Sequence, residues 1–340
     1  MATDDKAAGW RPRERWRGFN LLGMFIKHPG PNEDTASTGM TGDFAEDDFK
    51  WMRDWGFNFA RLPLDYRYWV PDGDWRAVLA DKLAPIDRAL EYGQRYGVHV
   101  QVCLHRIPGY CINSPAEPRD LFTDPEALAV AAEHWAFFAR RYRGVPNEAL
   151  SFDLLNEPDR HDAAAIARVF AALIAAVRDE DPGRFLILNG WDCGARPVRA
   201  LYGTPGVGHS MRGYAPHAVS HYRADWVTLP PEARPVWPQD ARPGKRWLLE
   251  EVFAPWEETL ARGEFLMANE CGCYHFTPHA VALSWLGDFF DLWKERDIGW
   301  ALWNLRGPFG VLDSGRADVA YEDFHGHKLD RALLALLERS

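Results

Sequence analysis

Two glutamates each end a short apolar run of the sequence. Glu157 follows the run 151–155 within an Asn-Glu-Pro motif, and Glu270 follows the run 265–268 in a second Asn-Glu pair. Such runs, bounded by turn residues, are typical of buried strands. A carboxylate at a strand mouth is either half of an ordinary ion pair or a reactive group, because burying an unpaired charge is costly. Two carboxylates across one pocket are the minimum needed to cleave a glycosidic bond, with one protonated and the other ionised.

Other apolar runs also end in residues that could line such a pocket. Arg61 lies in the run 57–64, and His105, His217 and Trp303 stand at or near the ends of three others. A guanidinium beside one carboxylate lowers the pKa of that carboxylate, so Arg61 is expected to keep one glutamate ionised. The alternative for Arg61 is a structural ion pair inside the fold, and the two roles are compatible.

The elements that must position these residues alternate between strand and helix. Eight strands in a chain of 340 residues, with a helix expected after all but the fifth, predict an α/β fold, a single closed (β/α)8 TIM barrel. We expect residues 1–15 to be loose and residues 16–340 to form the catalytic barrel, whose strand ends face one shared pocket. The predicted strands are 16–25, 57–64, 98–105, 151–157, 185–191, 207–218, 265–270 and 298–305. The predicted helices are 45–55, 83–96, 125–142, 163–179, 246–262, 280–296 and 329–339.

The composition argues against several classes of partner. The chain carries 39 Lys and Arg against 49 Asp and Glu, a net charge of −10, which disfavours nucleic acid and anionic membranes. No apolar run approaches the ~18 residues of a membrane span, and the N-terminus lacks a secretion signal. We therefore expect a cytoplasmic protein, or a secreted one if a signal was removed. The oligomeric state is left open.

No cofactor or metal is expected from the motifs. The five cysteines are scattered and do not form a disulfide framework, and there is no glycine-rich phosphate loop or ligand-spaced His and Asp cluster. Tryptophan is abundant, at 16 residues, and sugar-binding clefts use indole rings as flat stacking platforms. An oligosaccharide or glycoside is the expected ligand.

The motifs, taken in order, resemble glycoside hydrolase family 5, the cellulase-type branch of the retaining barrel hydrolases of clan A. The resemblance runs from about residue 18 to the C-terminus. It rests on the two Asn-Glu motifs, the second-strand arginine, the third-strand histidine, and the segments 300–303 and 309–313 around the eighth strand.

This resemblance implies a role for each candidate residue. Glu157 is expected to be the acid/base and Glu270 the nucleophile of a double displacement that retains configuration, with their carboxyl groups about 5–5.5 Å apart. The expected sugar-binding residues are Asn156 at the 2-hydroxyl, Trp303 as the floor of the −1 subsite, and Arg61 and His105, which orient and tune the carboxylates.

The sixth strand departs from the family pattern. The family usually has His-x-Tyr there, with the tyrosine touching the nucleophile, whereas this sequence reads His-Ala-Val at 217–219. We expect His217 to keep the histidine's place in substrate binding. For the tyrosine two alternatives stay open: Tyr222 or Tyr214 replaces it from a shifted loop, or its role is absent.

The substrate is less constrained than the reaction. The family covers β-1,4-glucans, mannans, β-1,3-glucans, xyloglucan and simple glycosides, and no tandem carbohydrate-binding module is visible. The long loops 106–123 and 219–244 would wall off one end of the cleft, and Trp226 and Trp237 favour a functional loop. We therefore expect β-linked oligosaccharides or glycosides of the glucan or mannan type. The alternative, favoured by the absent tyrosine, is a barrel of the same fold that binds sugar without cleaving it.

Overall fold

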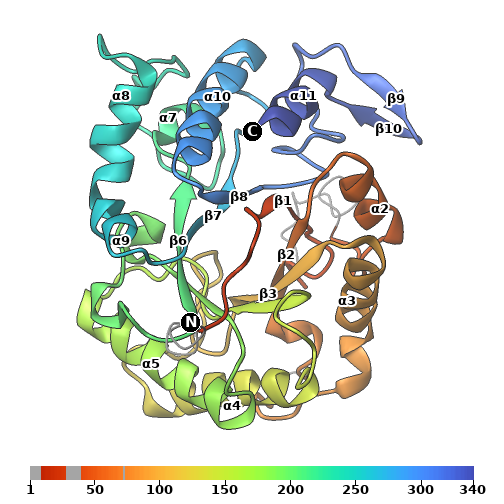
Figure 1. Ribbon diagram of the computed structural model, residues 1–340, viewed down its shortest axis with the longest axis vertical. Coiled ribbons are helices and arrows are strands. Elements are labelled where there is room, and N and C mark those ends of the chain that lie inside the picture. The colour runs from red at the N-terminus through yellow and green to blue at the C-terminus, as the bar shows by residue number, and fades with distance from the viewer. Residues whose placement is uncertain (1–8, 28–39, 72) are drawn as a thin grey trace, which may run out of the picture.

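Eight parallel strands close into a barrel in the computed structural model, which describes residues 9–27, 40–71 and 73–340 (Figure 1). The strands pair in sequence order, and β8 lies beside β1. Every residue of β2 to β8 is buried, as expected for parallel strands covered on both faces. The predicted (β/α)8 fold is therefore confirmed. The strands are β1 (Arg17–Asn20), β2 (Phe59–Asp65), β3 (His99–Arg106), β4 (Leu150–Asp153), β5 (Leu186–Asn189), β6 (Val207–Gly213), β7 (Leu266–Cys271) and β8 (Gly299–Leu302).

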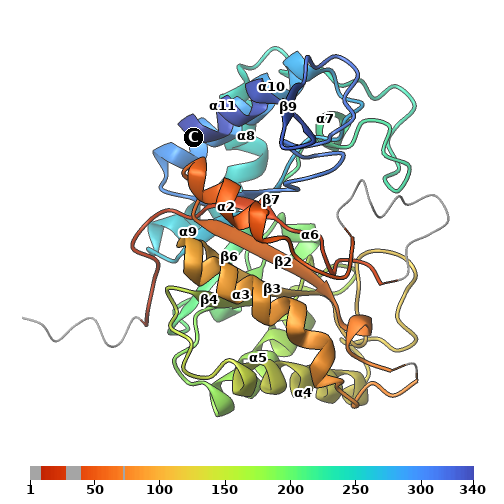
Figure 2. The same ribbon diagram turned by 90° about the vertical axis from the view of Figure 1, so that its right-hand side faces the viewer.

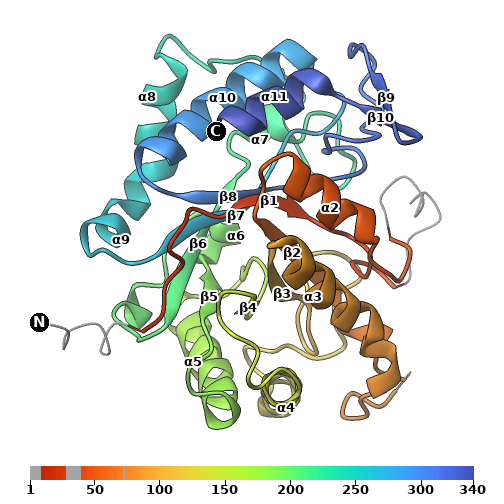
Figure 3. The same cartoon turned by 45° about the vertical axis from the view of Figure 1, so that its right-hand side comes forward.

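Helices form the outer layer of the barrel. They are α2 (Glu46–Asp54), α3 (Ala84–Tyr96), α4 (Pro125–Arg141), α5 (Ala163–Glu180), α6 (Trp191–Gly194), α7 (His217–Ser220), α8 (Gly244–Leu248), α9 (Glu257–Ala261), α10 (His279–Glu295) and α11 (Arg331–Arg339). In Figure 3, α2 and α3 cover one side of the strands, α4 and α5 a second, and α10 and α11 a third. Among the described residues, no helix is both long and apolar enough to span a membrane.

The long helices start and stop where their sequences predict. Asp124 caps α4 by accepting the backbone N–H of Glu126 at 2.9 Å, and proline occupies the first helical position. Asp162 caps α5 by accepting the N–H of Ala165 at 2.7 Å. Gly97 ends α3 in a left-handed conformation, with φ +67°.

Three elements differ from the prediction. The predicted helix 246–262 is broken into α8, a π-helical turn (Leu249–Phe253), a 3-10 turn (Ala254–Trp256) and α9, because Pro255 has no N–H to donate. The predicted strand 207–218 ends at Gly213. A hairpin of β9 (Glu322–Phe324) and β10 (His327–Leu329) precedes α11, and its two turn residues both have positive φ.

The N-terminal end of the barrel is filled by aromatic side chains. Trp16 stacks on His99 and Phe59, with ring centroids 4.1 and 5.0 Å apart. Trp10, within the segment expected to be loose, packs against Phe185 at 5.2 Å, while residues 1–8 lie outside the described ranges. Figure 2 shows the N-terminal tail at one end of the barrel and the loops that follow the strands at the other. The barrel interior is therefore closed at its N-terminal end, and in barrels of this kind the active site lies at the C-terminal end of the strands.

Candidate active site

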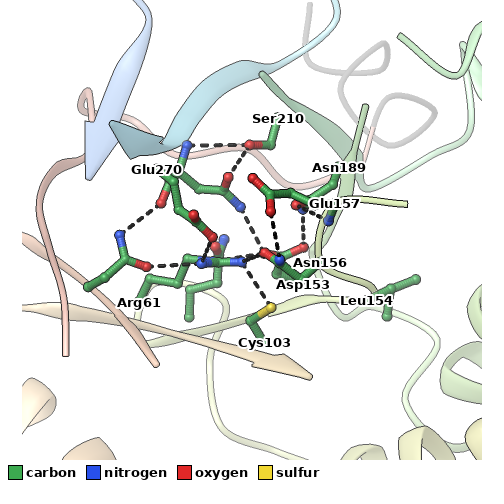
Figure 4. A network of polar contacts seen from close by, with 12 residues as sticks. Arg61, Cys103, Asp153, Leu154, Asn156, Glu157, Asn189, Ser210 and Glu270 are labelled. Carbon is green, nitrogen blue, oxygen red and sulfur yellow. Dashed lines mark hydrogen bonds and ion pairs between the residues drawn. The ribbon is translucent and has the colours of Figure 1, made fainter. Parts of the chain in front are cut away.

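Arg61 on β2 is completely buried and is the centre of a polar network inside the barrel (Figure 4). Its guanidinium bonds to side chains from four other strands and the segment after β4, which ties the strand ends to one another. The acceptors are Asn20 Oδ1 at 2.9 Å, Cys103 Sγ at 3.0 Å, Asp153 Oδ2 at 2.9 Å, Asn156 Oδ1 at 2.7 Å and Glu270 Oε1 at 2.5 Å.

Glu270 on β7 lies between two arginines. Arg61 Nη1 donates to its Oε1 at 2.5 Å, Arg212 Nη2 lies 3.2 Å from the same oxygen, and the Tyr214 hydroxyl donates to Oε2 at 3.2 Å. Burial alone raises the pKa of Glu270, but the positive charges of Arg212 and Arg61, followed by His105, lower it below its ordinary value. Glu270 is therefore held as a carboxylate.

His105 adds no positive charge beside Glu270 at neutral pH. Burial lowers the pKa of His105 to about 4, so the ring is neutral near pH 7. Its Nε2 lies 2.7 Å from Asn113 Oδ1, and its ring lies 5.8 Å from that of Trp303. The two arginines are thus the cations that keep Glu270 ionised.

Glu157 lies four residues beyond the end of β4 in an unusual backbone conformation. Its φ of +43° is in the left-handed region, which is uncommon for a residue with a Cβ. Its N–H donates to Asn189 Oδ1 at 3.1 Å, and its carbonyl oxygen accepts from the Tyr110 hydroxyl at 2.6 Å. These contacts from β5 and from the loop after β3 hold the residue where its side chain reaches the barrel mouth.

The carboxyl group of Glu157 is biased toward its protonated form. Burial raises its pKa and the charge of Glu270 raises it further, while Arg212, whose Nε donates to Oε1 at 2.8 Å, opposes both effects. The pKa of Glu157 stays above its ordinary value. The site thus holds one carboxyl group that can donate a proton and one carboxylate that can attack, the combination that glycoside cleavage requires.

The structure corrects the sixth-strand prediction. β6 ends at Gly213, so His217 does not end the strand: it is exposed in α7, and its ring contacts His221 at 5.2 Å. Tyr214, one of the two tyrosines considered, is the residue whose hydroxyl meets Glu270. Tyr222 is partly buried in the following turn, and no hydrogen bond joins it to either glutamate among the described residues. The expected place of His217 was wrong because β6 ends at Gly213, four residues earlier.

Arg212 is the functional residue that the sequence analysis missed. It lies on β6 two residues before Tyr214, so Arg-Gly-Tyr stands where His-x-Tyr was expected. The sequence at 212–214 does have a tyrosine two residues after a basic residue. The prediction instead rested on the histidine at 217, because the family pattern has a histidine at this place.

Two more predicted residues lie at the same end of the barrel. Asn156 is completely buried; its Oδ1 accepts from Arg61 and Arg212, and its Nδ2 lies 3.4 Å from Glu157 Oε2. Trp303 is partly buried after β8, with its ring 5.0 Å from that of Phe25.

Three buried polar residues that were not predicted complete the network. Asp153 accepts from Asn189 Nδ2 at 2.5 Å and from Asn269 Nδ2 at 2.8 Å, in addition to Arg61. Asp153 and Asn189 lie within or at the end of apolar runs, where a polar residue gives little signal by itself. Asn269 belongs to the second Asn-Glu motif, in which no role was assigned to the asparagine. In the described ranges, no three His, Cys, Asp or Glu side chains group as a metal site.

Comparisons with known proteins agree with this geometry. The family model "Cellulase (glycosyl hydrolase family 5)" matches residues 27–307. Endoglucanase C from Acetivibrio thermocellus is 25% identical over 333 residues, covering 90% of this chain and 95% of the relative. Cellodextrinase A from Ruminococcus flavefaciens is 26% identical over 249 residues, covering 71% of this chain and 72% of the relative. A solved structure described as a glycoside hydrolase is 33% identical, with a TM-score of 0.85 and coverage of 96% of this chain and 99% of the other.

The family match spans most of the barrel, and both the strand order and the buried glutamates fit it. The chain belongs to glycoside hydrolase family 5 and is a β-glycoside hydrolase that cleaves O-glycosyl bonds.

Proposed function

We propose that this chain hydrolyses β-1,4-linked gluco-oligosaccharides with retention of configuration, using Glu157 as the acid/base and Glu270 as the nucleophile. The observation that carries the proposal is that one guanidinium, that of Arg212, contacts both glutamates while their pKa values shift in opposite directions. Two intact carboxyl groups so arranged favour hydrolysis over a barrel that only binds sugar.

The first step of the reaction follows from the two protonation states. Glu270 attacks the anomeric carbon, the bond to the leaving oxygen breaks, and the proton of Glu157 passes to that oxygen. In the second step Glu157, now a carboxylate, takes a proton from the attacking water, and the bond between the sugar and Glu270 breaks. Tyr214 and Arg61 keep the Glu270 carboxylate oriented through both steps.

The substrate class is supported by the relatives and by an aromatic surface beside Tyr214. The two curated relatives described above are an endoglucanase and a cellodextrinase. The ring centroid of Phe309 lies 6.4 Å from that of Tyr214 and 5.3 Å from that of Tyr274. The ring centroid of Trp226, a residue that is 54% exposed, lies 5.0 Å from that of Tyr274. Trp226 is exposed and Tyr274 partly so, whereas Phe309 and Tyr214 behind them are buried. Rings open to solvent suit the flat faces of sugars beyond the −1 site, which favours an oligosaccharide over a single glycoside unit.

Trp237 of the same loop has a different role. Its indole nitrogen donates to Asp288 Oδ2 at 2.8 Å and its ring meets Trp247 at 5.6 Å, so it anchors the loop to α10. We assign the −1 subsite to Trp303 and Asn156, and the outer sugar contacts to Trp226.

The test is a hydrolysis panel of aryl β-glycosides, cello-oligosaccharides and manno-oligosaccharides with wild type beside Glu157→Ala. The proposal expects turnover of the gluco series, a loss of about 10²-fold or more in the variant, and partial rescue by azide on an activated leaving group. The matched control is Glu338→Ala on α11, which should retain full activity. Turnover confined to the manno series would overturn the substrate assignment, and a fully active Glu157→Ala would overturn the acid/base assignment.

A further inference from the structure

Arg212 contacts both glutamates at once. Its Nε donates to Glu157 Oε1 at 2.8 Å, and its Nη2 lies 3.2 Å from Glu270 Oε1. The side chain is only 4% exposed, so solvent screens these contacts weakly. A guanidinium is planar and stays charged at all working pH values, so the site holds one fixed positive charge between two carboxyl groups.

The other donors of Arg212 go to neutral oxygens. Nη1 donates to Asn269 Oδ1 and lies 3.5 Å from Ser210 Oγ, while Nη2 also donates to Asn189 Oδ1 and, at 2.7 Å, to Asn156 Oδ1. These acceptors fix the plane of the guanidinium without neutralising it. Because every N–H group has a partner within the protein, Arg212 acts on the glutamates rather than on the sugar.

The turn after β5 makes room for this arginine. A Cβ built on Gly194 would lie 2.5 Å from Arg212 Cγ, a separation that real Cβ atoms do not show. The two residues before it, Asp192 and Cys193, have φ of +57° and +51°, which bends the turn through the left-handed region. The glycine and the turn are therefore matched to an arginine at position 212.

The histidines around Glu270 supply no cation to Glu157. The charge of Arg61 also lowers the pKa of Glu157, but its guanidinium bonds to Glu270. Burial lowers the pKa of His105 to about 4 and that of His221 to about 3, so both rings are neutral near pH 7. Burial raises the pKa of the neighbouring thiols and phenol, which stay protonated. The groups facing Glu270 are Arg61 from β2, Cys103 and His105 from β3, Asp153 from β4, Tyr214, Cys271 from β7, and His221.

The surroundings of Glu157 contain one cation in direct contact. Tyr110 and Cys193 face it from the loops after β3 and β5, and burial raises the pKa of both, that of the thiol to about 12. Asp159 lies nearby, with its backbone N–H donating to the Tyr110 hydroxyl at 3.0 Å. Among the described residues, Arg212 is the cation whose nitrogen bonds to the Glu157 carboxyl group.

We infer that Arg212 is a counter-ion shared by the acid/base and the nucleophile, so that one negative charge faces it at every stage of the reaction. This inference rests on the proposed roles of Glu157 and Glu270. Arg212 is a positioning residue, since it works through the two glutamates.

The charge at each stage follows from the bonds made and broken. In the free enzyme Glu270 is ionised and Glu157 is protonated, so Arg212 faces one negative charge, on Glu270. When the ester to Glu270 forms, that carboxylate loses its charge, and Glu157 gains one by giving its proton to the leaving oxygen. Arg212 then pairs with Glu157 and keeps it ionised, the form that must take a proton from water. Hydrolysis of the ester returns the charge to Glu270.

The test compares Arg212→Gln, which removes the charge, with Arg212→Lys, which keeps it. On an aryl β-glycoside with a good leaving group, ester hydrolysis limits kcat, and that step needs ionised Glu157. Loss of the cation raises the pKa of both glutamates, so in Arg212→Gln both limbs of the kcat/KM profile move to higher pH by about one pH unit. In the same variant kcat falls about tenfold on the acid side of its own pH profile. In Arg212→Lys both limbs of the kcat/KM–pH profile should stay close to those of wild type.

A second measurement does not depend on turnover. In protein labelled with ¹³C at the glutamate carboxyl carbons and trapped as the ester with a 2-fluoro sugar, Glu157 should titrate at higher pH in Arg212→Gln than in wild type. Should Arg212→Gln fail to fold, Arg212→Met replaces it, because its side chain is unbranched like that of arginine and carries no charge at any pH.

The outcomes separate this inference from the proposed function. A wild type that turns over no member of the glycoside panel contradicts the proposed function. An active wild type whose kcat and kcat/KM pH limbs are matched by those of Arg212→Gln, with both constants reduced in the same ratio at every pH, contradicts the shared counter-ion, because a purely structural role lowers both without moving the limbs.

Discussion

Glu157 and Glu270 have the same side chain, and only their surroundings distinguish them. Glu270 is buried and the side chain of Glu157 is 15% exposed, and this burial raises the pKa of each. Glu270 receives two arginines, whereas Glu157 receives one and also feels the charge of Glu270. The second arginine, Arg61, therefore distinguishes the proposed nucleophile from the proposed acid/base.

The opposite pKa shifts of Glu157 and Glu270 predict how the activity of the enzyme depends on pH. Activity requires ionised Glu270, so kcat/KM rises with pH through a pKa below that of an ordinary glutamate. It also requires protonated Glu157, so kcat/KM falls through a pKa above the ordinary value. The plot of kcat/KM against pH for an aryl β-glycoside should be bell-shaped, with its acid limb below the ordinary glutamate pKa and its basic limb above it. An acid limb at or above that value would contradict the assignment of Glu270.

At the scale of the element, the end of β6 positions the site through the alternation of its side chains. Arg212 and Tyr214 point to the glutamates, and Gly213 between them faces the outer layer. A Cβ on Gly213 would lie 2.5 Å from Trp293 Cη2 and 2.7 Å from Cys271 Cβ. The glycine thus lets β6, β7 and α10 pack closely behind the two functional side chains.

Gly213→Ala should therefore lower both stability and activity. The added methyl overpacks the contact with Trp293, which costs about 1–3 kcal/mol of unfolding free energy, and it displaces Arg212 and Tyr214. The control is Gly287→Ala in α10, where the nearest atom to a new Cβ is Leu336 Cδ1 at 3.8 Å, and which should gain about 0.5–1 kcal/mol. Urea unfolding and kcat measure both effects. Equal stability of the two variants would show that the packing at Gly213 is looser than described.

At the scale of the whole molecule, stability and chemistry lie at opposite ends of the barrel. Trp16, Phe59 and Phe185 form an apolar cluster at the N-terminal end, while the buried arginines and carboxylates gather at the C-terminal end. This division lets the site carry several buried charges, because packing elsewhere supplies the stability.

Trp16→Ala tests this division. Removing a buried indole stacked on His99 should cost about 3–5 kcal/mol of unfolding free energy, with kcat of the folded enzyme unchanged. Trp226→Ala, which removes a half-exposed ring near the site, should change stability by less than about 0.5 kcal/mol. Denaturant titrations of both variants give the comparison. A loss of kcat in Trp16→Ala at full folding would mean that the two ends are coupled.

The fold was predictable from the sequence because periodic apolar patterns repeat eight times, and the helix ends carry their own signals, such as Asp124 and Gly97. Arg61, His105, Asn156 and Trp303 could be placed because each sits at or near a strand end in a recognisable motif. The end of β6 could not be predicted, because polar and apolar residues continue to alternate after Gly213. His217, four residues later, is the residue type that the family pattern has at the end of this strand. Asn189 and Asp153 give no signal alone, since their partners come from distant strands.

The most direct test of the account is covalent trapping of the nucleophile. A 2-deoxy-2-fluoro β-glucoside with a good leaving group is expected to inactivate the enzyme and raise its intact mass by one fluorosugar. Peptide mass spectrometry should find that sugar on Glu270, in wild type and in Glu157→Ala alike. A label on any other carboxylate, or steady hydrolysis with inversion at the anomeric carbon and no adduct, would contradict the assignment of Glu270 as the nucleophile of a retaining hydrolase.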